Sequence, residues 1–318
     1  MVYPARSMRK PLHATKRVAV LGVGKLGAAM ARRLSALGRD VDVAVWSRSA
    51  TARGRARPDA LRQLERAGAR IAETPAECVQ DANFVLAVLA DGAATRAVLR
   101  GKDGALAGMI SSSARRRPLF VDASTSGRRA ALELAEALAA HEIAYVDAAM
   151  SGTVGPAERG ELVTMVGASK RDLARAKPLL DLLCKRIIHA GGVGQGQALK
   201  VVLNGVGAHH FVAFASMLAL GERAGLSRAV LLDAFTTGAF ASPSYVGKKD
   251  KALARAYGDP DFTLRLARKD AALNLELQRE VGLSLPVVKA LARAMDAAVA
   301  EGLGEGDLFG IEEHFRRR

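Results

Sequence analysis

Short, unbroken apolar runs alternate with helical patterns through roughly the first 190 residues of the chain. Such runs are typical of strands buried on both faces of a parallel sheet, with helices covering each face. The pattern therefore predicts an α/β fold with a doubly wound, parallel sheet. The predicted strands are residues 17–21, 41–47, 84–90, 119–124, 143–150, 162–168 and 186–191.

The pattern changes after residue 196, where strand-like runs disappear and only helical periodicity remains. The first helix of this part has about 30 residues and would span roughly 45 Å, long enough to join two lobes. We expect a basic, disordered tail over residues 1–16, a sheet domain over 17–191 and an all-α domain over 192–318. The predicted helices are residues 22–38, 58–68, 130–141 and 170–184, then 196–225, 227–237, 246–256, 261–281 and 286–301.

Composition narrows the possible partners of this chain. Half of the 318 residues are apolar but only 4% are aromatic, so the core must be built from aliphatic side chains. Lysine and arginine exceed aspartate and glutamate by 47 − 32 = 15, which suits a nucleic acid or an anionic substrate and cofactor. The arginine clusters are scattered and have no interleaved aromatic residues, so solvated helix faces are favoured and a nucleic-acid partner is not expected.

The cellular compartment of the protein is indicated by its cysteines, histidines and apolar runs. Cys78 and Cys184 lie far apart and no histidines have metal-ligand spacing, so neither a disulfide framework nor a metal site is predicted. No apolar run reaches the roughly 18 residues of a membrane span. The first 16 residues also lack the apolar stretch of a secretory signal. We expect a cytoplasmic protein without a membrane partner.

A glycine-rich turn follows the first predicted strand and opens a helix. In the Gly-x-Gly-x-x-Gly pattern, the first glycine permits a tight turn, the second lets a pyrophosphate approach the backbone, and the third allows close strand–helix packing. In this strand–turn–helix context the pattern predicts a Rossmann-type dinucleotide-binding domain. The predicted cofactor-binding residues of the turn are Gly22, Val23, Gly24, Lys25, Leu26 and Gly27. The P-loop of ATPases is excluded, because Ala19 replaces its first glycine and Leu26 its serine or threonine.

The end of the second strand indicates which dinucleotide binds. An NAD enzyme usually has Asp or Glu there, where the adenine ribose is bound, but this chain has Ser47, Arg48 and Ser49. An arginine flanked by two hydroxyls suits the additional 2′-phosphate of NADP. We predict NADP(H) in preference to NAD(H). The alternative is an arginine at a solvated strand end.

Lys200 and Asn204 end the glycine-rich segment GGVGQGQALKVVLN, which starts at Gly191. Residues four apart lie on one face of a helix, so the ammonium and the carboxamide point in the same direction. An ammonium group is costly to bury among apolar neighbours unless it is paired or loses its proton, and such a lysine can act as a general acid or base. The alternative is a surface lysine whose stem lies along an apolar helix.

Polar residues follow two further predicted strands. Ser124 ends one and Thr125 follows it, and Ser151 and Gly152 come directly after the next. Ligands of open α/β sheets bind at the carboxyl ends of the strands. A Ser-Gly turn offers a hydroxyl and backbone N–H groups to a carboxylate, although either segment read alone is more often an ordinary turn.

Four segments, in this order, resemble the β-hydroxyacid dehydrogenases, the group containing 3-hydroxyisobutyrate dehydrogenase, tartronate semialdehyde reductase and 6-phosphogluconate dehydrogenase. They are GVGKLGAAMARRL, DAAMSGTVGPAERGELVTMVGA, GGVGQGQALKVVLN and KDAALNLE, and the resemblance covers about residues 17–315. It implies that Lys200 is the catalytic acid/base. It implies that Ser151, Gly152 and Asn204 bind the substrate, and that Leu89, Ala90, Thr125 and Lys269 contact the cofactor.

The resemblance also implies the reaction, a hydride transfer between NADP and a small β-hydroxyacid or semialdehyde of the 3-hydroxyisobutyrate, tartronate semialdehyde or succinic semialdehyde type. In this interpretation Ser124 helps Ser151 and Gly152 to hold the substrate carboxylate. The helical half resembles that of a family that dimerises through it, so a homodimer is expected. The family's usual DAPVSGG is DAAMSGT here, so Met150 and Thr153 leave the identity of the substrate open.

Two other functions stay open at this point. Imine reductases share the fold but typically lack the catalytic lysine, so Lys200 favours alcohol–carbonyl chemistry. A non-catalytic, nucleotide- or nucleic-acid-binding relative would also agree with the net charge of +15.

Overall fold

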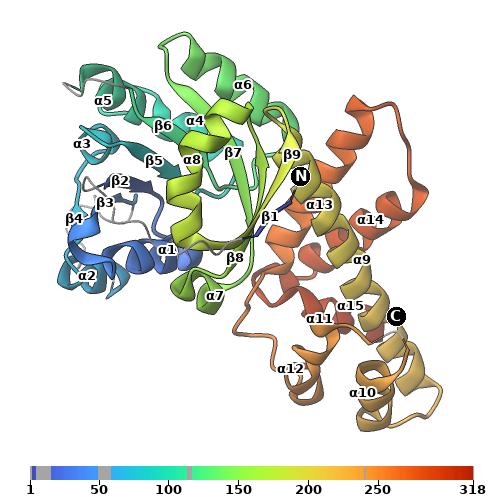
Figure 1. Ribbon diagram of the computed structural model, residues 1–318. Coiled ribbons are helices and arrows are strands. Elements are labelled where there is room, and N and C mark those ends of the chain that lie inside the picture. Colours follow the sequence, from blue (N-terminus) through green and yellow to red (C-terminus); the bar gives the residue numbers. More distant parts are fainter. Residues whose placement is uncertain (1, 5–15, 49–58, 113–116, 240, 318) are drawn as a thin grey trace. The chain divides into compact units, whose positions relative to one another are not determined.

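The computed structural model describes residues 2–4, 16–48, 59–112, 117–239 and 241–317 (Figure 1). The chain forms two compact units, residues 1–200 and residues 201–318. The first unit contains the sheet and the second is helical, which confirms the predicted fold class.

Nine strands of the described residues form one sheet in the order β1-β9-β8-β7-β6-β5-β2-β3-β4. All seven predicted strands are present. The two further strands, β1 and β4, have three and two residues, too few for a pattern to reveal them. The strands are β1 Val2–Pro4, β2 Lys16–Leu21, β3 Val41–Trp46, β4 Arg70–Ile71, β5 Phe84–Ala87, β6 Leu119–Asp122, β7 Ala144–Ser151, β8 Leu162–Gly167 and β9 Cys184–Gly191.

The sheet is mostly parallel, as predicted, but two of its strand pairs are antiparallel. β8 runs antiparallel to β7, and β1 runs antiparallel to β9. A parallel crossover needs a dozen or more residues. The connection between β7 and β8 has only residues 152–161, with the short helix α7 (Val154–Arg159), so the chain turns back beside the strand it has just left.

Helices cover both faces of the sheet. α1 (Lys25–Ser35), α2 (Asp59–Arg66), α7 and α8 (Lys170–Leu183) pack on one face. The other face is covered by α3 (Pro75–Val79), α4 (Gly92–Leu99), α5 (Ala105–Ser111) and α6 (Arg128–Ala139). Of these, α3, α4, α5 and α7 were not predicted, because one or two turns are too short to establish helical periodicity.

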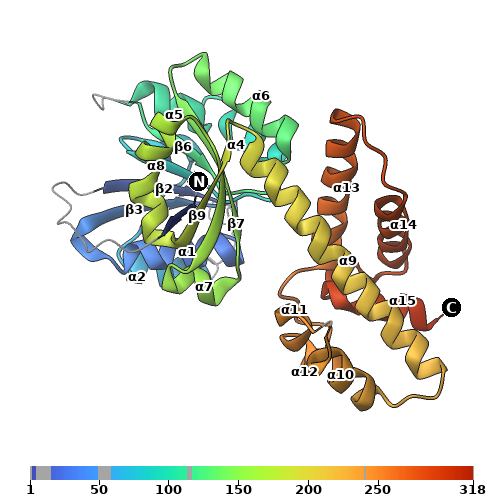
Figure 2. The same ribbon diagram turned by 45° about the vertical axis from the view of Figure 1, so that its right-hand side comes forward.

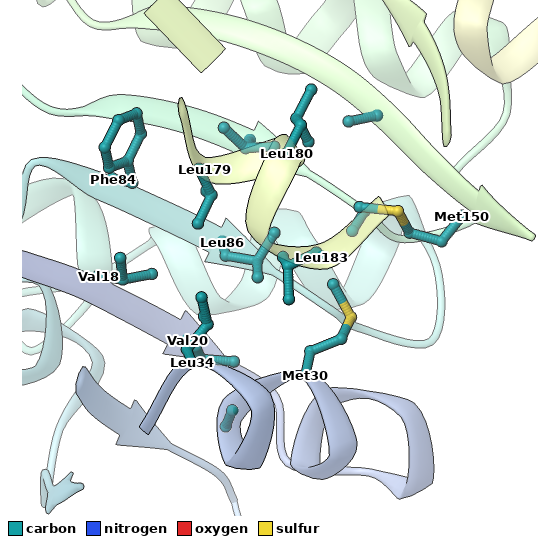
Figure 3. Packing of buried hydrophobic residues seen from close by; sticks show 14 of the residues in the cluster. Val18, Val20, Met30, Leu34, Phe84, Leu86, Met150, Leu179, Leu180 and Leu183 are labelled. Atoms are coloured by element: carbon teal, nitrogen blue, oxygen red, sulfur yellow. The ribbon is translucent and has the colours of Figure 1, made fainter. Parts of the chain in front are cut away.

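Alternating side chains of each strand enter the two cores. On β2, Val18 and Val20 pack on the α8 side, whereas Ala19 and Leu21 pack on the α6 side. Figure 3 shows the first core, where leucines of α8 lie over Val18 and Val20 of β2. The core is largely aliphatic, as the composition predicts, and it holds the strand ends in a rigid frame.

Two predicted boundaries differ from the structure. The expected disordered tail is corrected at both ends, because Val2–Pro4 pair with β9 and Lys16 begins β2; residues 5–15 lie outside the described residues. The units divide after Lys200, nine residues beyond the predicted boundary at 191/192. The division falls inside a helix because the first turns of that helix are bonded to the sheet unit through Gln197.

The helical unit packs around its own apolar core, formed mainly by the long helices α9, α13 and α14. Within the range predicted as one helix, 246–256, the structure has α12 over Lys249–Ala254, and the short helix α11 over Pro243–Val246 was not predicted. α9 has 29 residues. Figure 2 shows it as one continuous helix. The helices are α9 Gln195–Arg223, α10 Arg228–Thr237, α11 Pro243–Val246, α12 Lys249–Ala254, α13 Leu264–Glu280, α14 Pro286–Ala300 and α15 Glu312–Arg316. Single 3-10 turns lie at Gly38–Asp40, Leu303–Glu305 and Leu308–Ile311.

Among the described residues, α9 is the one helix long and apolar enough to cross a membrane by length and composition. Core helices of soluble proteins meet the same criterion. Gln197 and Val201 of this helix are buried inside the protein.

Candidate active site

The carboxyl ends of four neighbouring parallel strands lie in register at one edge of the sheet. Leu21 at the end of β2 is opposite Trp46 of β3 and Ala87 of β5, and Ala87 is opposite Asp122 of β6. The chain leaves β2 first toward β3 and later returns to its other side as β5, so β2 is the topological switch point where such sheets bind ligands. The segments that follow these ends carry the predicted residues Gly22, Ser47, Arg48, Leu89, Ala90 and Thr125.

The three glycines of the turn after β2 have different roles. Gly22 has φ +105°, and a Cβ there would lie 2.3 Å from the carbonyl oxygen of Val88. A Cβ on Gly27 would lie 2.1 Å from the carbonyl oxygen of Gly22. Around Gly24, by contrast, a Cβ would meet nothing within 4 Å. Backbone conformation and packing therefore require Gly22 and Gly27, whereas Gly24 borders open space where a ligand can approach.

The start of α1 is suited to an anion. The helix begins at Lys25 with Gly24 as its N-cap, has no side-chain cap and has no acidic residue in its first turn. Its N-terminal N–H groups and the positive end of its dipole thus face the open side of the loop. Val23 and Leu26 pack partly against the core, while Gly24 and Lys25 are exposed. These features fit the pyrophosphate of a dinucleotide.

Ser47 and Arg48 follow β3, directly beside this loop. The N–H of Gly22 donates to the carbonyl oxygen of Trp46 at 2.9 Å, which ties the two segments together. Ser47 is half-buried and Arg48 is exposed. Ser49, the third residue of the predicted phosphate-binding set, lies outside the described residues.

Ser124 is placed differently from its expected role in holding a substrate carboxylate. Its side chain is only 2% exposed, and its hydroxyl oxygen accepts a hydrogen bond from the N–H of Leu89 at 2.9 Å. The hydroxyl thus joins the segment after β5 to the segment after β6. Leu89 and Thr125 are half-buried next to this bond, and Ala90 is exposed.

The Ser151–Gly152 turn ends β7. Gly152 has φ +136°, and a Cβ there would lie 2.6 Å from Leu162, so the turn requires glycine. Gly152 and Thr153 are exposed, whereas Met150 is buried in the core, where Sγ of Cys184 lies 3.7 Å from its sulfur (Figure 3). Of the two residues that leave the identity of the substrate open, Met150 therefore belongs to the core, and Thr153 is the one that solvent can reach.

Lys200 is 8% exposed on α9, so it is not a solvated surface lysine. It ends the sheet unit, and Asn204 follows one turn later in the helical unit. Helical spacing keeps both side chains on one face of α9.

The helical unit orients Asn204. The amide nitrogen of Asn204 donates to Oδ2 of the buried Asp270 at 2.6 Å, and Nζ of Lys269 lies 3.1 Å from Oδ1. A carboxylate can only accept, so it selects the NH₂ end of the amide and leaves the Asn204 carbonyl oxygen to accept from a hydroxyl group. Lys269, the last predicted cofactor residue, lies on α13 beside this pair. Asp270 belongs to the KDAALNLE segment, but no pattern in the sequence indicated a function for it.

Three buried polar residues of the sheet unit were also not predicted to function: Asp122, Asp147 and Gln197. Burial raises the pKa of Asp147 to about 7, against the opposing effect of two backbone N–H donors. Burial likewise raises the pKa of Asp122, although Ser124, Tyr145 and Ser126 donate to it. Asp147 begins the DAAMSGT segment, and Asp122 lies two residues before Ser124. No spacing signal indicates Gln197. Across the described residues, no group of three or more His, Cys, Asp or Glu could hold a metal ion.

Comparison with known proteins agrees with this arrangement. Residues 17–192 match the family of the NAD-binding domain of 6-phosphogluconate dehydrogenase. Residues 194–312 match the family described as the NAD-binding domain of NADP-dependent 3-hydroxyisobutyrate dehydrogenase. The two matches together cover most of the sheet unit and most of the helical unit.

Individual relatives span nearly the whole chain. It is 32% identical to 3-hydroxyisobutyrate dehydrogenase of Pseudomonas aeruginosa, over 94% of this chain and 98% of that protein. It is 30% identical to glyoxylate/succinic semialdehyde reductase 1 of Arabidopsis thaliana, over 93% of this chain and 97% of that protein. The solved structure of Mycobacterium tuberculosis 3-hydroxyisobutyrate dehydrogenase with L-serine superposes with a TM-score of 0.78 at 28% identity, covering 95% of this chain and 99% of that one.

The dinucleotide-binding edge of the sheet, the two family matches and these full-length relatives agree with one another. The chain is an NAD(P)-dependent oxidoreductase that belongs to the β-hydroxyacid dehydrogenase family.

Proposed function

We propose that this protein interconverts a small β-hydroxyacid and the corresponding semialdehyde, with NADP(H) preferred over NAD(H) and Lys200 as the acid/base. The burial of Lys200 carries the proposal. Lysine is seldom buried, so a lysine that is only 8% exposed, in the first turns of a helix bonded to the cofactor-binding edge, is a candidate for acid/base chemistry.

The cofactor would be held by residues whose geometry fits it. The glycine turn and the start of α1 bind the pyrophosphate, and Ser47 and Arg48 bind the 2′-phosphate of the adenine ribose. When bound, the nicotinamide supplies or accepts the hydride. The protein contributes orientation and charge.

The side chains of this chain move the proton and hold the substrate. In reduction, the Lys200 ammonium donates a proton to the substrate oxygen as negative charge develops there, and its positive charge stabilises that oxygen. In oxidation, the neutral amine of Lys200 takes the hydroxyl proton. The Ser151 hydroxyl and the N–H of Gly152 bind the substrate carboxylate, and the carbonyl oxygen of Asn204 accepts from its hydroxyl.

The test is NADPH oxidation with glyoxylate, succinic semialdehyde, tartronate semialdehyde and methylmalonate semialdehyde. Lys200→Ala should lower kcat by about 10²- to 10⁴-fold, as expected for loss of a general acid. Lys170→Ala is the matched control, since Lys170 is exposed at the start of α8. Turnover by Lys200→Ala at the control's rate would refute the role of Lys200.

The same assay separates the imine reductase alternative. Cyclic imines added to the panel should be reduced slowly or not at all, because proton donation by a buried lysine suits an alkoxide. Faster reduction of imines than of every semialdehyde would overturn the proposed substrate class.

A further inference from the structure

Gln197 is a completely buried amide three residues before Lys200 on α9. Its Oε1 accepts from the N–H of Ser126 at 2.9 Å and of Gly127 at 3.2 Å. Its Nε2 donates to the carbonyl oxygen of Ser124 at 2.8 Å. One side chain of the first turn of α9 therefore bonds three backbone groups of the 124–127 loop after β6.

Asp147 holds the same turn from β7. Its two carboxylate oxygens accept from the N–H of Gly194 at 2.6 Å and of Gln197 at 2.8 Å. A Cβ on Gly167 or Gly196 would lie 2.3 or 2.4 Å from these oxygens, so the neighbouring glycines make room for the carboxylate. The start of α9 is thus bonded to the sheet unit in two directions.

Asp122 supports the loop that Gln197 binds. It lies opposite Asp147 in the sheet and accepts from the N–H of Ser124 and the hydroxyl groups of Ser126 and Tyr145, each at 3.0 Å. The loop cannot turn without breaking several buried hydrogen bonds, each of which is costly to leave unmade.

We propose that Gln197 is a positioning residue for Lys200. Its amide fixes the rotation of the first turns of α9 relative to the 124–127 loop, and thereby the place of the ammonium relative to the bound cofactor. This inference rests on the proposed function of Lys200. Catalysis is sensitive to such placement, since a shift of about 1 Å can cost on the order of 100-fold in rate.

The bonding pattern requires a neutral group at position 197. That group must accept from two N–H donors at one end and donate to a carbonyl oxygen at the other. A glutamine does so at every pH, and a glutamic acid does so only while it is protonated. The buried carboxylates Asp122 and Asp147 raise the pKa of a glutamate placed there, as burial does, while Lys200 three residues later opposes them.

The experiment compares Gln197→Glu and Gln197→Met with the same substitutions at Gln195, which is exposed on the same turn. Each variant is assayed from about pH 5 to pH 9 for kcat and for the KM of NADPH, and NADPH binding gives the fraction of active sites. Gln197→Met should lower kcat about 10- to 100-fold at every pH with little change in the KM of NADPH. Gln197→Glu should approach wild-type kcat in acid and lose it as the pH rises. Both Gln195 variants should keep the wild-type profile.

Any result other than these would contradict the inference. If Gln197→Met keeps the wild-type kcat, or if Gln197→Glu keeps the wild-type pH profile, Gln197 does not position Lys200, while the activity of the wild type still supports the proposed function. If Gln197→Met does not fold, Gln197→Glu decides, because its protonated form restores the native hydrogen bonds. If the wild type reduces no substrate of the panel, the proposed function fails and the positioning role fails with it.

Discussion

At the scale of single residues, side chains suited to contact a ligand differ from side chains that hold the surrounding loops in position. We propose that Lys200 contacts a ligand, whereas the hydroxyl group of Ser124 holds the segment after β5 through its hydrogen bond to Leu89. Alternation along β7 likewise turns Met150 into the core and leaves Ser151 at the strand end. Residue type alone did not distinguish these cases, since hydroxyl groups serve both purposes.

Arg48 carries the residue-scale prediction on the cofactor. Arg48→Ala should raise the KM of NADPH by about 10- to 100-fold, because a hydrogen bond to a charged group contributes about 1.5–3 kcal/mol. The KM of NADH should change little, since NADH lacks the 2′-phosphate. The control is Arg171→Ala, on the exposed side of α8. Equal changes for both cofactors would show that Arg48 does not recognise the phosphate.

At the scale of elements, the strand–turn–helix unit of β2 and α1 joins folding to cofactor binding. Gly27 lets the helix pass against the backbone of Gly22, and Gly24 leaves space on the outer side of the turn. The same three-glycine pattern thus contains two positions required by backbone conformation and packing, and one position, Gly24, that borders open space and that we propose is required by the ligand.

Two alanine substitutions separate these requirements. Gly27→Ala should lower the free energy of unfolding by about 1–3 kcal/mol, because its methyl group overlaps a backbone oxygen. Gly24→Ala should change stability by less than about 0.5 kcal/mol, yet weaken NADPH binding about tenfold by blocking the pyrophosphate. Thermal unfolding and fluorescence titration with NADPH measure the two effects. Normal binding by a stable Gly24→Ala variant would contradict this assignment.

At the scale of the whole molecule, buried carboxylates link folding to pH. Burial raises the pKa of Asp147 from its ordinary value of 3.8 to about 7. Between these values the folded protein holds a proton that the unfolded chain has lost, so stability falls as the pH rises through this window.

Asp147→Asn removes this linkage. The measured quantity is the free energy of unfolding of the wild type minus that of the variant. This difference should fall by about 4 kcal/mol as the pH rises from about 4 to 7, since each pKa unit corresponds to about 1.4 kcal/mol. Denaturant titrations at several pH values measure it. A difference that does not vary with pH would contradict the raised pKa of Asp147.

The helical unit provides a second prediction at this scale. Apolar side chains are exposed on α9, including Val206, Met217 and Leu220. We propose that they form a homodimer interface, so the mass in solution should be about twice 33.4 kDa. Leu220→Glu should shift the mass toward the monomer, whereas Leu132→Glu, on the exposed face of α6, should not. Light scattering after size-exclusion chromatography measures both, and a monomeric wild type would refute the interface.

The features that could be predicted are those whose pattern lies within one continuous stretch of the chain and is long enough to be recognised. The seven strands, the 29-residue helix α9, the glycine turn and the Lys200–Asn204 pair each show a period or spacing within a few residues. The reversed direction of β8 and the role of Ser124 show no such signal. They depend on the length of a connection and on a hydrogen-bond partner 35 residues away.

By itself, the sequence determined the fold class, and it supplied the proposals that the turn after β2 binds the dinucleotide and that Lys200 transfers the proton. Hydrophobic periodicity and the chemistry of Gly, Arg and Lys depend on residues that are close together in the chain, so the sequence alone reveals them. Only the tertiary structure decided that Asp147 and Gln197 hold the start of α9. Their contacts join residues 47 to 73 positions apart, and such contacts exist only after the sheet has brought the strand ends together.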